Sequence, residues 1–343
     1  REKLGIAFPG GTYEHLFYVA EVEAKGPMID GELHASVDES DFVAVFPLKK
    51  PGHVRLIGTI RPESETERDD LGWDDVSTGL LERLRIEVRR VNWFSTYRVH
   101  HRVATRFRHG RAFLLGDAAH IHSPVGGQGM NTGIGDSVNL AWKLAAVLRG
   151  RAPASILDSY EPERIGFARR LVATTDRVFQ FVTRTGPLAA YVRVNVAPRV
   201  ISAAFRLRAV RRFLFRTVSQ TAIAYPASPL SEGRAGRIRG GDRLPWVQSG
   251  PDNFAPLQSL DWQLHVYGTA TRALADACAV RRLPLHVFPW TPAAARAGFA
   301  RNAAYLVRPD GHVALADLSQ DRAVVERYLD GRGIRLTTAD GPC

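Results

Sequence analysis

The feature that most constrains the fold is a glycine-rich loop between a short apolar strand and a long amphipathic helix. The predicted strand covers residues 112–115, and the helix is predicted to begin near Asn131 or Thr132. Gly116 and the two alanines after Asp117 are small enough for a flat or extended molecule to lie against the backbone. This arrangement is typical of α/β proteins that bind a ligand at the carboxyl end of a strand.

The loop carries groups that suit a ligand with hydroxyls and a developing negative charge. The Asp117 carboxylate can accept hydrogen bonds from the hydroxyls of a polyol chain. Gly126, Gly127 and Gly129 allow positive φ, so that backbone N–H groups can turn inward beside the helix start. A helix start carries partial positive charge and unpaired donors, which would stabilise the anionic pyrimidine edge of a reduced flavin.

Two other interpretations of the loop compete with a flavin site. Gly127-x-Gly129 resembles half of a dinucleotide fingerprint, but Thr132 stands where the third glycine belongs. The loop from Gly116 to Asn131 is also too long for that tight turn. The second alternative is an ordinary glycine-rich connection that caps a helix, and spacing alone does not separate it from a flavin loop.

Hydrophobic patterns predict an α/β chain with two regions of sheet. Residues 13–60 alternate as strands of an antiparallel sheet with a turn at 49–52. A linker rich in Pro, Ser and Gly is predicted at 225–241. The other predicted elements are helices over 75–90, 155–183, 187–221, 271–280 and 320–328, extended chain over 91–107, strands over 262–267 and 285–288, and a hairpin over 304–316 that turns at Pro309, Asp310 and Gly311.

The positive charge of the chain is concentrated in one segment. Between Arg164 and Arg216 there are twelve arginines and one acidic residue, Asp176, which accounts for the whole net charge of +11. The segment is predicted as amphipathic helices, so solvated arginine faces around an apolar stripe are the first interpretation. An anionic surface or a cofactor phosphate is the alternative partner.

Cysteine content and apolar runs exclude several classes of protein. Cys278 and Cys343 are too few for a disulfide framework, a zinc site or a redox pair. No apolar run reaches the length of a transmembrane helix, and the first residues have no signal-peptide profile and no methionine. We therefore expect a cytoplasmic protein without stable membrane insertion or a metal site, whose first residue is not a natural start.

The glycine-rich region resembles a known family. The run GRAFLLGDAAHIHSPVGGQGMNTGIGDSVNLAWKLAAVLRG, residues 110–150, is similar to the second FAD-binding motif of the class A flavoprotein monooxygenases. These aromatic hydroxylases include the phenol and p-hydroxybenzoate hydroxylases. The similarity continues through Tyr160-Glu-Pro-Glu-Arg164 and Ser219-Gln220, and covers essentially the whole chain.

The resemblance implies which residues hold FAD. Asp117 would bind the ribityl chain, Pro124 would lie beside the isoalloxazine, and the backbone from Gly127 to Asn131 would face flavin N1 and O2. Arg1 matches the last residue of the family's DGxxSxxR motif, so the chain is expected to lack the fingerprint for the ADP moiety and not to retain FAD by itself. The complete set of expected cofactor-binding residues is Arg1, Gly116, Asp117, Pro124, Gly127, Gln128, Gly129, Met130 and Asn131.

The expected fold follows from the same resemblance. It is an α/β fold with part of a glutathione-reductase-like FAD/NAD(P)-binding domain, an inserted antiparallel substrate sheet and a thioredoxin-like C-terminal domain. Tyr267-Gly268-Thr269-Ala270 stands where a redox CxxC would lie, which favours a structural or oligomerisation role, including a homodimer. The expected boundaries are 1–105 for the substrate domain, 106–184 for the FAD-binding part, 185–232 for basic helices and linker, and 233–343 for the thioredoxin-like domain.

The implied activity is hydroxylation of an aromatic substrate, phenolic or polyketide-like. In the family, NAD(P)H reduces FAD, O₂ forms a flavin C4a-hydroperoxide, and the ring takes the terminal oxygen; the protein supplies a dry pocket. Tyr97 aligns with a pocket tyrosine and is the candidate catalytic residue, although a half-buried strand tyrosine would look the same. His100 and His101 should point to opposite faces of a strand, and His120 and His122 receive no acid–base role.

Two other functions remain open at this stage. The same scaffold could carry out epoxidation, Baeyer–Villiger ring oxygen insertion or oxidation of a non-aromatic substrate. The chain could instead be a noncatalytic binding or assembly module. The expected partners are an aromatic small molecule, O₂ and NAD(P)H, with no nucleic acid.

Overall fold

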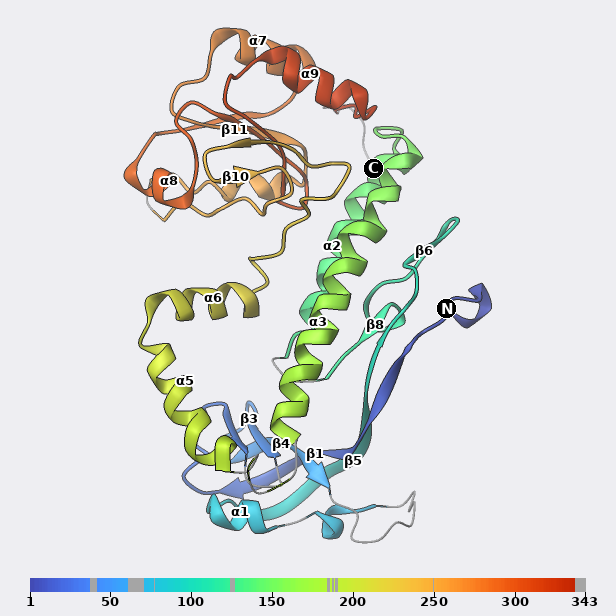
Figure 1. Cartoon of the computed structure of the whole chain (residues 1–343), viewed down its shortest axis with the longest axis vertical. Helices are drawn as coiled ribbons and strands as arrows, with labels where there is room; N and C mark the ends of the chain where they lie inside the picture. Colours follow the sequence, from blue (N-terminus) through green and yellow to red (C-terminus); the bar gives the residue numbers. More distant parts are fainter. Residues whose placement is uncertain are drawn as a thin grey trace.

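The computed structural model in Figure 1 places an antiparallel sheet at one end of the molecule and a second α/β unit at the other. The helices α2 and α3 run between them. The structure describes residues 1–37, 42–60, 71–76, 78–123, 127–183, 186, 188, 191–248 and 250–336.

The first sheet has the strand order β2-β3-β4-β1-β5-β8, and every neighbouring pair is antiparallel. Its long central strands pair in a register that sets Phe17 opposite Tyr97. The predicted strands and the turn at 49–52 are confirmed. The strands are β1 (Gly10–Lys25), β2 (His34–Val37), β3 (Phe42–Pro47), β4 (His53–Ile60), β5 (Glu87–Val103) and β8 (His120–Ile121).

The helix predicted over 75–90 is wrong. Only a 3-10 turn (Trp73–Asp75) and the five-residue α1 (Gly79–Arg83) form, and β5 already begins at Glu87. Arg85 takes a left-handed φ of 55° and turns the chain from α1 into the strand. Pairing of the strand with Lys25 and its neighbours outweighs the local preference for helix.

The two faces of this sheet have different neighbours. One face packs its apolar side chains, including Tyr18 and Val22, against α1. The other face carries a smaller cluster of Tyr13, Phe17 and Val99. The Tyr13 hydroxyl donates a 2.7 Å hydrogen bond to Asp176, which ties this second face to α3.

The glycine-rich region leads from the sheet into two long helices. β6 (Arg108–His109) and β7 (Ala112–Phe113) form a short hairpin, a 3-10 turn (Gly116–Ala118) follows, and α2 runs over Gly129–Leu148. A second 3-10 segment (Ala154–Ser159) then leads into α3 (Tyr160–Thr183). The helix predicted from Asn131 or Thr132 therefore begins at Gly129.

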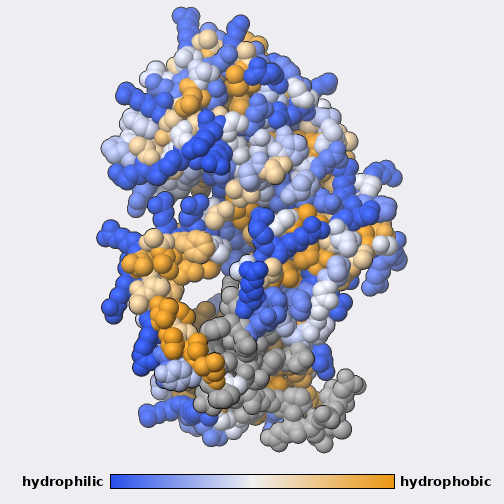
Figure 2. All heavy atoms as spheres, in the orientation of Figure 1, coloured by the Kyte–Doolittle hydropathy of each residue, from blue (hydrophilic) through white to orange (hydrophobic). Residues whose placement is uncertain are grey.

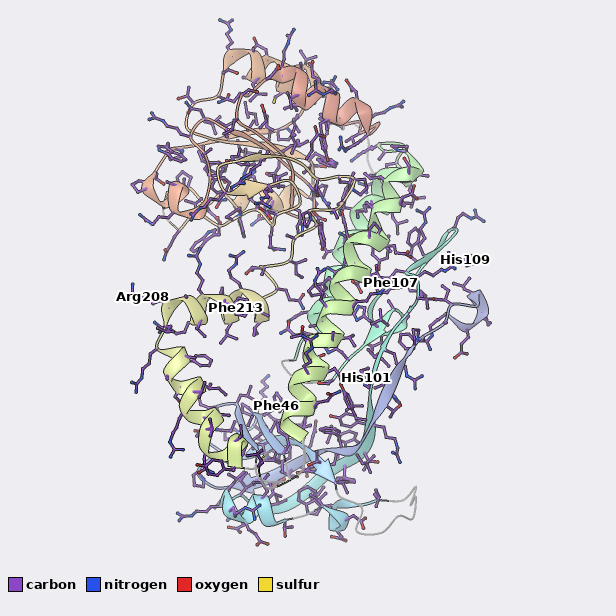
Figure 3. All side chains as sticks on the ribbon, viewed as in Figure 1. Phe46, His101, Phe107, His109, Arg208 and Phe213 are labelled. Carbon is purple, nitrogen blue, oxygen red and sulfur yellow. The ribbon has the colours of Figure 1, made fainter. Side chains whose placement is uncertain are left out.

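The basic segment forms a π-helical turn (Val192–Val196), α5 (Ala197–Phe205) and α6 (Arg208–Val218). These helices curve outward between the sheet and the C-terminal end in Figure 1. Apolar side chains along them are exposed, as Figure 2 shows; Phe213 on α6 is 67% exposed. Figure 3 labels Phe213 and Arg208 on α6. The predicted apolar stripe thus exists, but it is not covered by the described residues.

Residues 232–336 form the second α/β body, which we call the C-terminal unit. Its sheet has the order β10-β9-β14-β13-β11-β12, with β11 parallel to β12 and antiparallel to β13. The predicted linker contains its first two strands, and α8 was not predicted. The elements are β9 (Glu232–Ala235), β10 (Ile238–Arg239), a 3-10 turn (Ala255–Ser259), β11 (Gln263–Tyr267), α7 (Arg272–Arg281), β12 (Leu285–Phe288), α8 (Pro292–Ala297), β13 (Ala304–Val307), β14 (Val313–Asp317) and α9 (Arg322–Gly331). Among the described residues, no helix has the length and apolarity needed to span a membrane.

Candidate flavin site

Gly116 and Asp117 form the 3-10 turn that follows β7. Gly116 has a left-handed φ of 56°, which favours glycine. A Cβ added to Gly133 would lie 3.4 Å from the Gly116 Cα, so the loop and α2 approach each other closely. The side chain of Asp117 follows at the exposed end of this turn. Its carboxylate is therefore open to the hydroxyls of a ligand.

The start of α2 presents backbone donors to solvent. Gly127 has a φ of 60° and open space around its Cα, as expected for a glycine that turns its N–H inward. Gly129, Met130 and Asn131 form the exposed first turn, whereas Gln128 before them is buried. The positive φ expected at Gly129 is wrong, because this residue is already helical. Pro124 and Gly126 lie outside the described residues.

Asp136, on the second turn of α2, hydrogen-bonds the backbone of the glycine-rich loop at Gly116. It is fully buried, and its Oδ2 accepts hydrogen bonds of 2.9 Å from the Gly116 N–H and lies 2.9 Å from His120 Nε2. Its Oδ1 accepts one of 2.6 Å from Arg164 Nε. Burial raises the pKa of Asp136, but the hydrogen bond from His120 and the charge of Arg164 hold it below its usual value. Asp136 therefore remains ionised.

Arg164 of α3 joins the loop to the segment before the C-terminal unit. Its NH2 donates a 3.1 Å bond to the Thr132 carbonyl, and its NH1 donates a 2.9 Å bond to the Tyr225 hydroxyl. A Cβ on Gly135 would lie 3.0 Å from NH2, so the guanidinium rests on α2 where only glycine fits comfortably. The buried charge is thus paired and all three of its nitrogens have acceptors.

A second buried cluster joins the helices to the C-terminal unit. The Glu163 carboxylate accepts hydrogen bonds from Lys143 at 2.7 Å and from Arg308 at 2.6 and 3.0 Å. Arg308 also pairs with Asp310, whose carboxylate accepts a 3.1 Å bond from the Trp142 indole. Burial raises the pKa of Glu163, but the charges of Arg308 and Lys143 lower it to about 2. Burial lowers the pKa of Lys143 to about 8 despite Glu163.

Tyr97 lies on the sheet face that α3 covers. Its ring centroid is 5.7 Å from that of Phe17, and burial raises the pKa of its hydroxyl. No described residue hydrogen-bonds this hydroxyl. His100 Nδ1 lies 2.7 Å from the Thr12 hydroxyl, and the His101 ring packs 4.6 Å from that of Tyr13, as expected for side chains on opposite faces. Figure 3 labels His101 near α3.

Arg1 and His122 both contact residues that are close to them in the sequence. The Arg1 guanidinium lies 3.7 Å above the Phe8 ring, and in the described part of the chain no hydrogen bond or ion pair joins it to the loop. His122 Nδ1 donates a 2.8 Å hydrogen bond to the Ser123 carbonyl. His120 Nε2 lies 2.9 Å from the Asp136 carboxylate and supports it. His120 and His122 therefore do not form an acid–base pair with each other. Among the described residues, no cluster of three or more His, Cys, Asp or Glu could hold a metal ion.

Sequence analysis did not identify Asp136 and Arg164 as site residues. A signal existed, because Asp136, Asn139 and Lys143 are spaced three and four apart in an otherwise apolar helix. All three are buried and make polar contacts with α3. Polar residues on one face of an apolar helix indicate a buried partner helix with matching charges.

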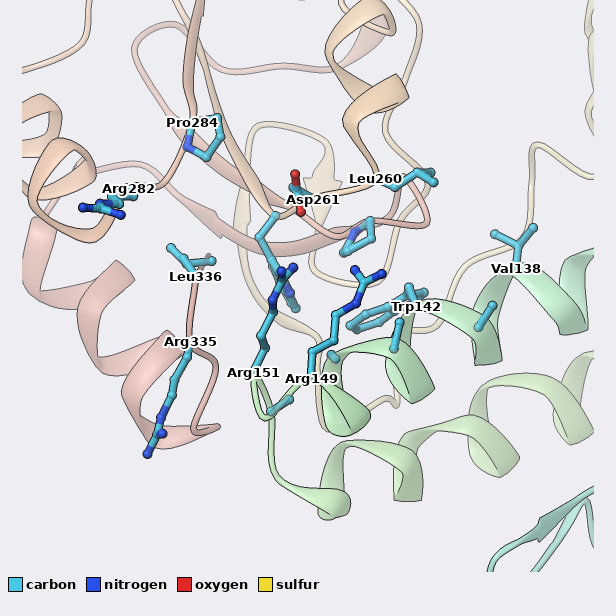
Figure 4. Close-up of a pocket in the computed structure, with 16 residues that line it drawn as sticks. Val138, Trp142, Arg149, Arg151, Leu260, Asp261, Arg282, Pro284, Arg335 and Leu336 are labelled. Carbon is cyan, nitrogen blue, oxygen red and sulfur yellow. The ribbon is translucent and has the colours of Figure 1, made fainter. Parts of the chain in front are cut away.

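An apolar cleft lies elsewhere. It has a volume of about 410 Å³ and separates the C-terminal half of α2 from the C-terminal unit. Figure 4 shows Val138 and Trp142 of α2 on one side and Leu260, Asp261 and Pro284 on the other. Because the residues of the glycine-rich loop do not line it, the cleft belongs to the contact between α2 and the C-terminal unit.

Comparison with known proteins gives consistent results. A flavin-dependent monooxygenase of Mycobacteroides abscessus is 30% identical over an alignment of 341 positions that covers 96% of this chain and 63% of that protein. A 6-methylpretetramide 4-monooxygenase of Streptomyces rimosus is 35% identical over 245 residues, covering 68% of this chain and 42% of that protein. The solved structure of the anhydrotetracycline hydroxylase OxyS from Streptomyces rimosus superposes with a TM-score of 0.73 at 27% identity, over 98% of this chain and 67% of that one. The chain thus spans less than two thirds of the mycobacterial relative.

Fold, loop and relatives together make the chain similar to the flavoprotein aromatic hydroxylases. In particular, the family model for the FAD binding domain matches residues 1–175, and the chain belongs to that family. The residues present fit the flavin end of the cofactor. Gly116 and Gly133 let the loop pack closely on α2, Asp117 offers acceptors, and the first turn of α2 offers N–H donors.

Proposed function

We propose that this chain forms the flavin-facing and substrate-binding part of an FAD-dependent monooxygenase that hydroxylates aromatic compounds. The observation that carries the proposal is the exposed pair of Asp117 and the α2 start, held by the buried Asp136–Arg164 ion pair. When bound, the flavin supplies the redox chemistry, taking reducing equivalents from NAD(P)H and activating O₂. The names of the 6-methylpretetramide monooxygenase and the anhydrotetracycline hydroxylase support an aromatic, polyketide-like substrate.

Asp117, Gly127 and the first turn of α2 carry the main proposed roles toward the flavin. Asp117 would accept hydrogen bonds from the ribityl hydroxyls, and the N–H groups of Gly129, Met130 and Asn131 would stabilise negative charge on the pyrimidine edge of the flavin. Gly127 would let the backbone approach the ring. Gln128, which is buried, would support this turn and not contact the ring. Pro124 and Arg1 are proposed as further contacts on the resemblance alone.

The substrate is proposed to lie beside Tyr97, which is half-buried on the sheet face that α3 partly covers. Phe17, Tyr13 and Val99 make this face apolar, which suits a flat ring and excludes water. The Tyr97 hydroxyl has no described partner and is available to a phenolic oxygen. Because burial raises its pKa, Tyr97 would be a neutral donor that orients the substrate, and not a general base.

The proposed domains follow the same boundaries, 1–105, 106–184, 185–232 and 233–343. Support for a thioredoxin-like C-terminal domain comes from its βαβαββα succession and the strand order β14-β13-β11-β12. Tyr267 to Ala270 contain no cysteine, so the proposed role of this domain is structural, including dimerisation.

The test is oxygen transfer under ¹⁸O₂ with FAD, NADH or NADPH and a phenolic substrate. It is made on the chain alone and on the longest reading frame that contains it. Ring hydroxylation with one ¹⁸O atom supports the proposal, whereas a labelled epoxide or ring-expanded ester indicates epoxidation or Baeyer–Villiger chemistry. Absence of any labelled product together with absence of flavin binding in both proteins would contradict the proposal and favour a noncatalytic module.

A further inference from the structure

The segment between α6 and the C-terminal unit touches the support of the flavin loop at two points. Gln220, just after α6, donates 3.0 Å hydrogen bonds from Nε2 to the Gln128 side chain and to the Thr132 hydroxyl. Five residues later, the Tyr225 hydroxyl accepts the bond from Arg164 NH1. Gln220 contacts the first turn of α2 directly, whereas Tyr225 reaches it through Arg164 of α3, which bonds the Thr132 carbonyl.

The geometry at Gln220 is specific. This residue takes a left-handed φ of 55°, which is uncommon for a residue other than glycine, and its backbone N–H bonds the Thr217 carbonyl. The Thr132 hydroxyl that it contacts also donates 2.8 Å to the Gln128 carbonyl. Gln220 therefore links the residue before α2 to the first turn of the helix.

The geometry at Tyr225 extends into the C-terminal unit. Its ring is buried, lies 4.5 Å from the His312 ring and is covered by the Arg308 guanidinium at 5.6 Å. Its backbone N–H bonds the Gly241 carbonyl at 2.9 Å. Tyr225 is thus fixed by the C-terminal unit, while its hydroxyl completes the donors of Arg164, which holds Asp136 and, through it, the Gly116 N–H.

We propose that Tyr225 and Gln220 are positioning residues through which the C-terminal unit holds Gly116 and the first turn of α2 in the geometry that faces the flavin. The inference rests on the proposed function, since it concerns the segment assigned to the cofactor. It gives the C-terminal unit a role in the flavin site although that unit contributes no residue to the exposed loop.

The first test is hydrogen–deuterium exchange on the chain without cofactor. Tyr225→Phe keeps the ring contacts with His312 and Arg308 but leaves Arg164 NH1 without its acceptor. Exchange of amides in residues 128–136 should rise about tenfold, the effect expected for one lost hydrogen bond to a buried charge. Tyr328→Phe is the matched control, because its buried hydroxyl donates 2.7 Å to Leu230 instead.

A second variant covers the other contact. Gln220→Ala should raise exchange in the same peptides, whereas Thr217→Ala should not, because the Thr217 hydroxyl bonds only the Phe213 carbonyl of its own helix. Melting temperatures show whether each variant folds. If Tyr225→Phe and Gln220→Ala leave exchange at 128–136 unchanged, or if Tyr328→Phe raises it equally, the positioning claim is overturned.

Riboflavin affinity, measured by fluorescence anisotropy, is the second readout. The Kd should rise about tenfold in Tyr225→Phe and stay within twofold in Tyr328→Phe. A chain that binds no riboflavin but shows the exchange effect would sink the proposed function and leave the positioning of α2 intact. A chain that binds riboflavin equally in all variants, without an exchange effect, would sink the positioning claim alone.

Discussion

Replacing Asp136 with asparagine removes the charge that supports the flavin loop while preserving the shape of the side chain. In the protein this carboxylate meets three donors, the Gly116 N–H, His120 Nε2 and Arg164 Nε. The asparagine side chain has one oxygen that can accept hydrogen bonds, so its NH2 group would face at least one of these donors. The buried Arg164 charge loses its counter-ion.

The magnitude follows from these contacts. Breaking a buried ion pair costs about 3–5 kcal/mol. The amide oxygen of asparagine recovers one hydrogen bond, worth about 1 kcal/mol. We therefore expect Asp136→Asn to lower the free energy of unfolding by about 2–4 kcal/mol, a large share of the ~5–15 kcal/mol that holds a typical domain together.

Urea unfolding followed by far-UV circular dichroism measures this change, and Asp117→Asn is the matched control. Asp117 is exposed and supports no described side chain, so its variant should unfold within about 0.5 kcal/mol of the parent. Riboflavin affinity should respond to Asp117→Asn without any loss of stability. If Asp136→Asn unfolds like the parent, or if Asp117→Asn is the destabilised variant, the assignment of support and ligand roles is refuted.

Three further predictions test other parts of the account. The charges of Arg308 and Lys143 hold the pKa of Glu163 at about 2, below its ordinary 4.5. The contribution of Glu163 to stability is therefore complete above pH 4.5 and is lost as the pH falls towards 2. The urea midpoint of Glu163→Gln should accordingly depend less on pH over this range than that of the parent chain. Gly135→Ala should lower the urea midpoint, because the new Cβ would lie 3.0 Å from the NH2 of Arg164, whose guanidinium is held by three acceptors. Gly166→Ala is the control: its Cβ would lie 3.6 Å from Arg170 NH1, and the change should raise stability by about 0.5–1 kcal/mol. Equal effects of the two variants would contradict the close approach at Gly135. Tyr97→Phe should leave the midpoint and riboflavin affinity unchanged but weaken binding of a phenolic ligand in calorimetry, and unchanged ligand binding would remove Tyr97 from the pocket.

The first sheet and the glycine-rich loop before α2 could be predicted from sequence because their signals are local. Alternation along residues 13–60 and the small residues around Asp117 each lie within a few positions of one another. The helix predicted over 75–90 failed because pairing of β5 with β1, far away in sequence, decided the structure there. The same reason hid β9 within the predicted linker, because its partner β14 pairs Leu315 with Glu232, 83 positions earlier in the chain.

The buried charges could not be paired from sequence. Arg164 and Asp136 are 28 positions apart, and Arg308 and Glu163 are 145 apart. A single sequence shows that such residues exist, but their partners follow only from how α2, α3 and the C-terminal unit pack. The sequence therefore indicates the glycine-rich loop but not the buried ion pairs that support it.

The central claim is that the exposed loop at Asp117 and the α2 start binds the part of the cofactor that riboflavin, FMN and FAD share. The decisive measurement is the affinity of the chain for these three flavins, by fluorescence anisotropy with protein in the high micromolar range. The account predicts similar weak binding of all three, lost in Asp117→Asn and accompanied by exchange protection at residues 127–136. Failure of all three to bind, or binding that requires the adenosine half and ignores Asp117→Asn, would contradict it.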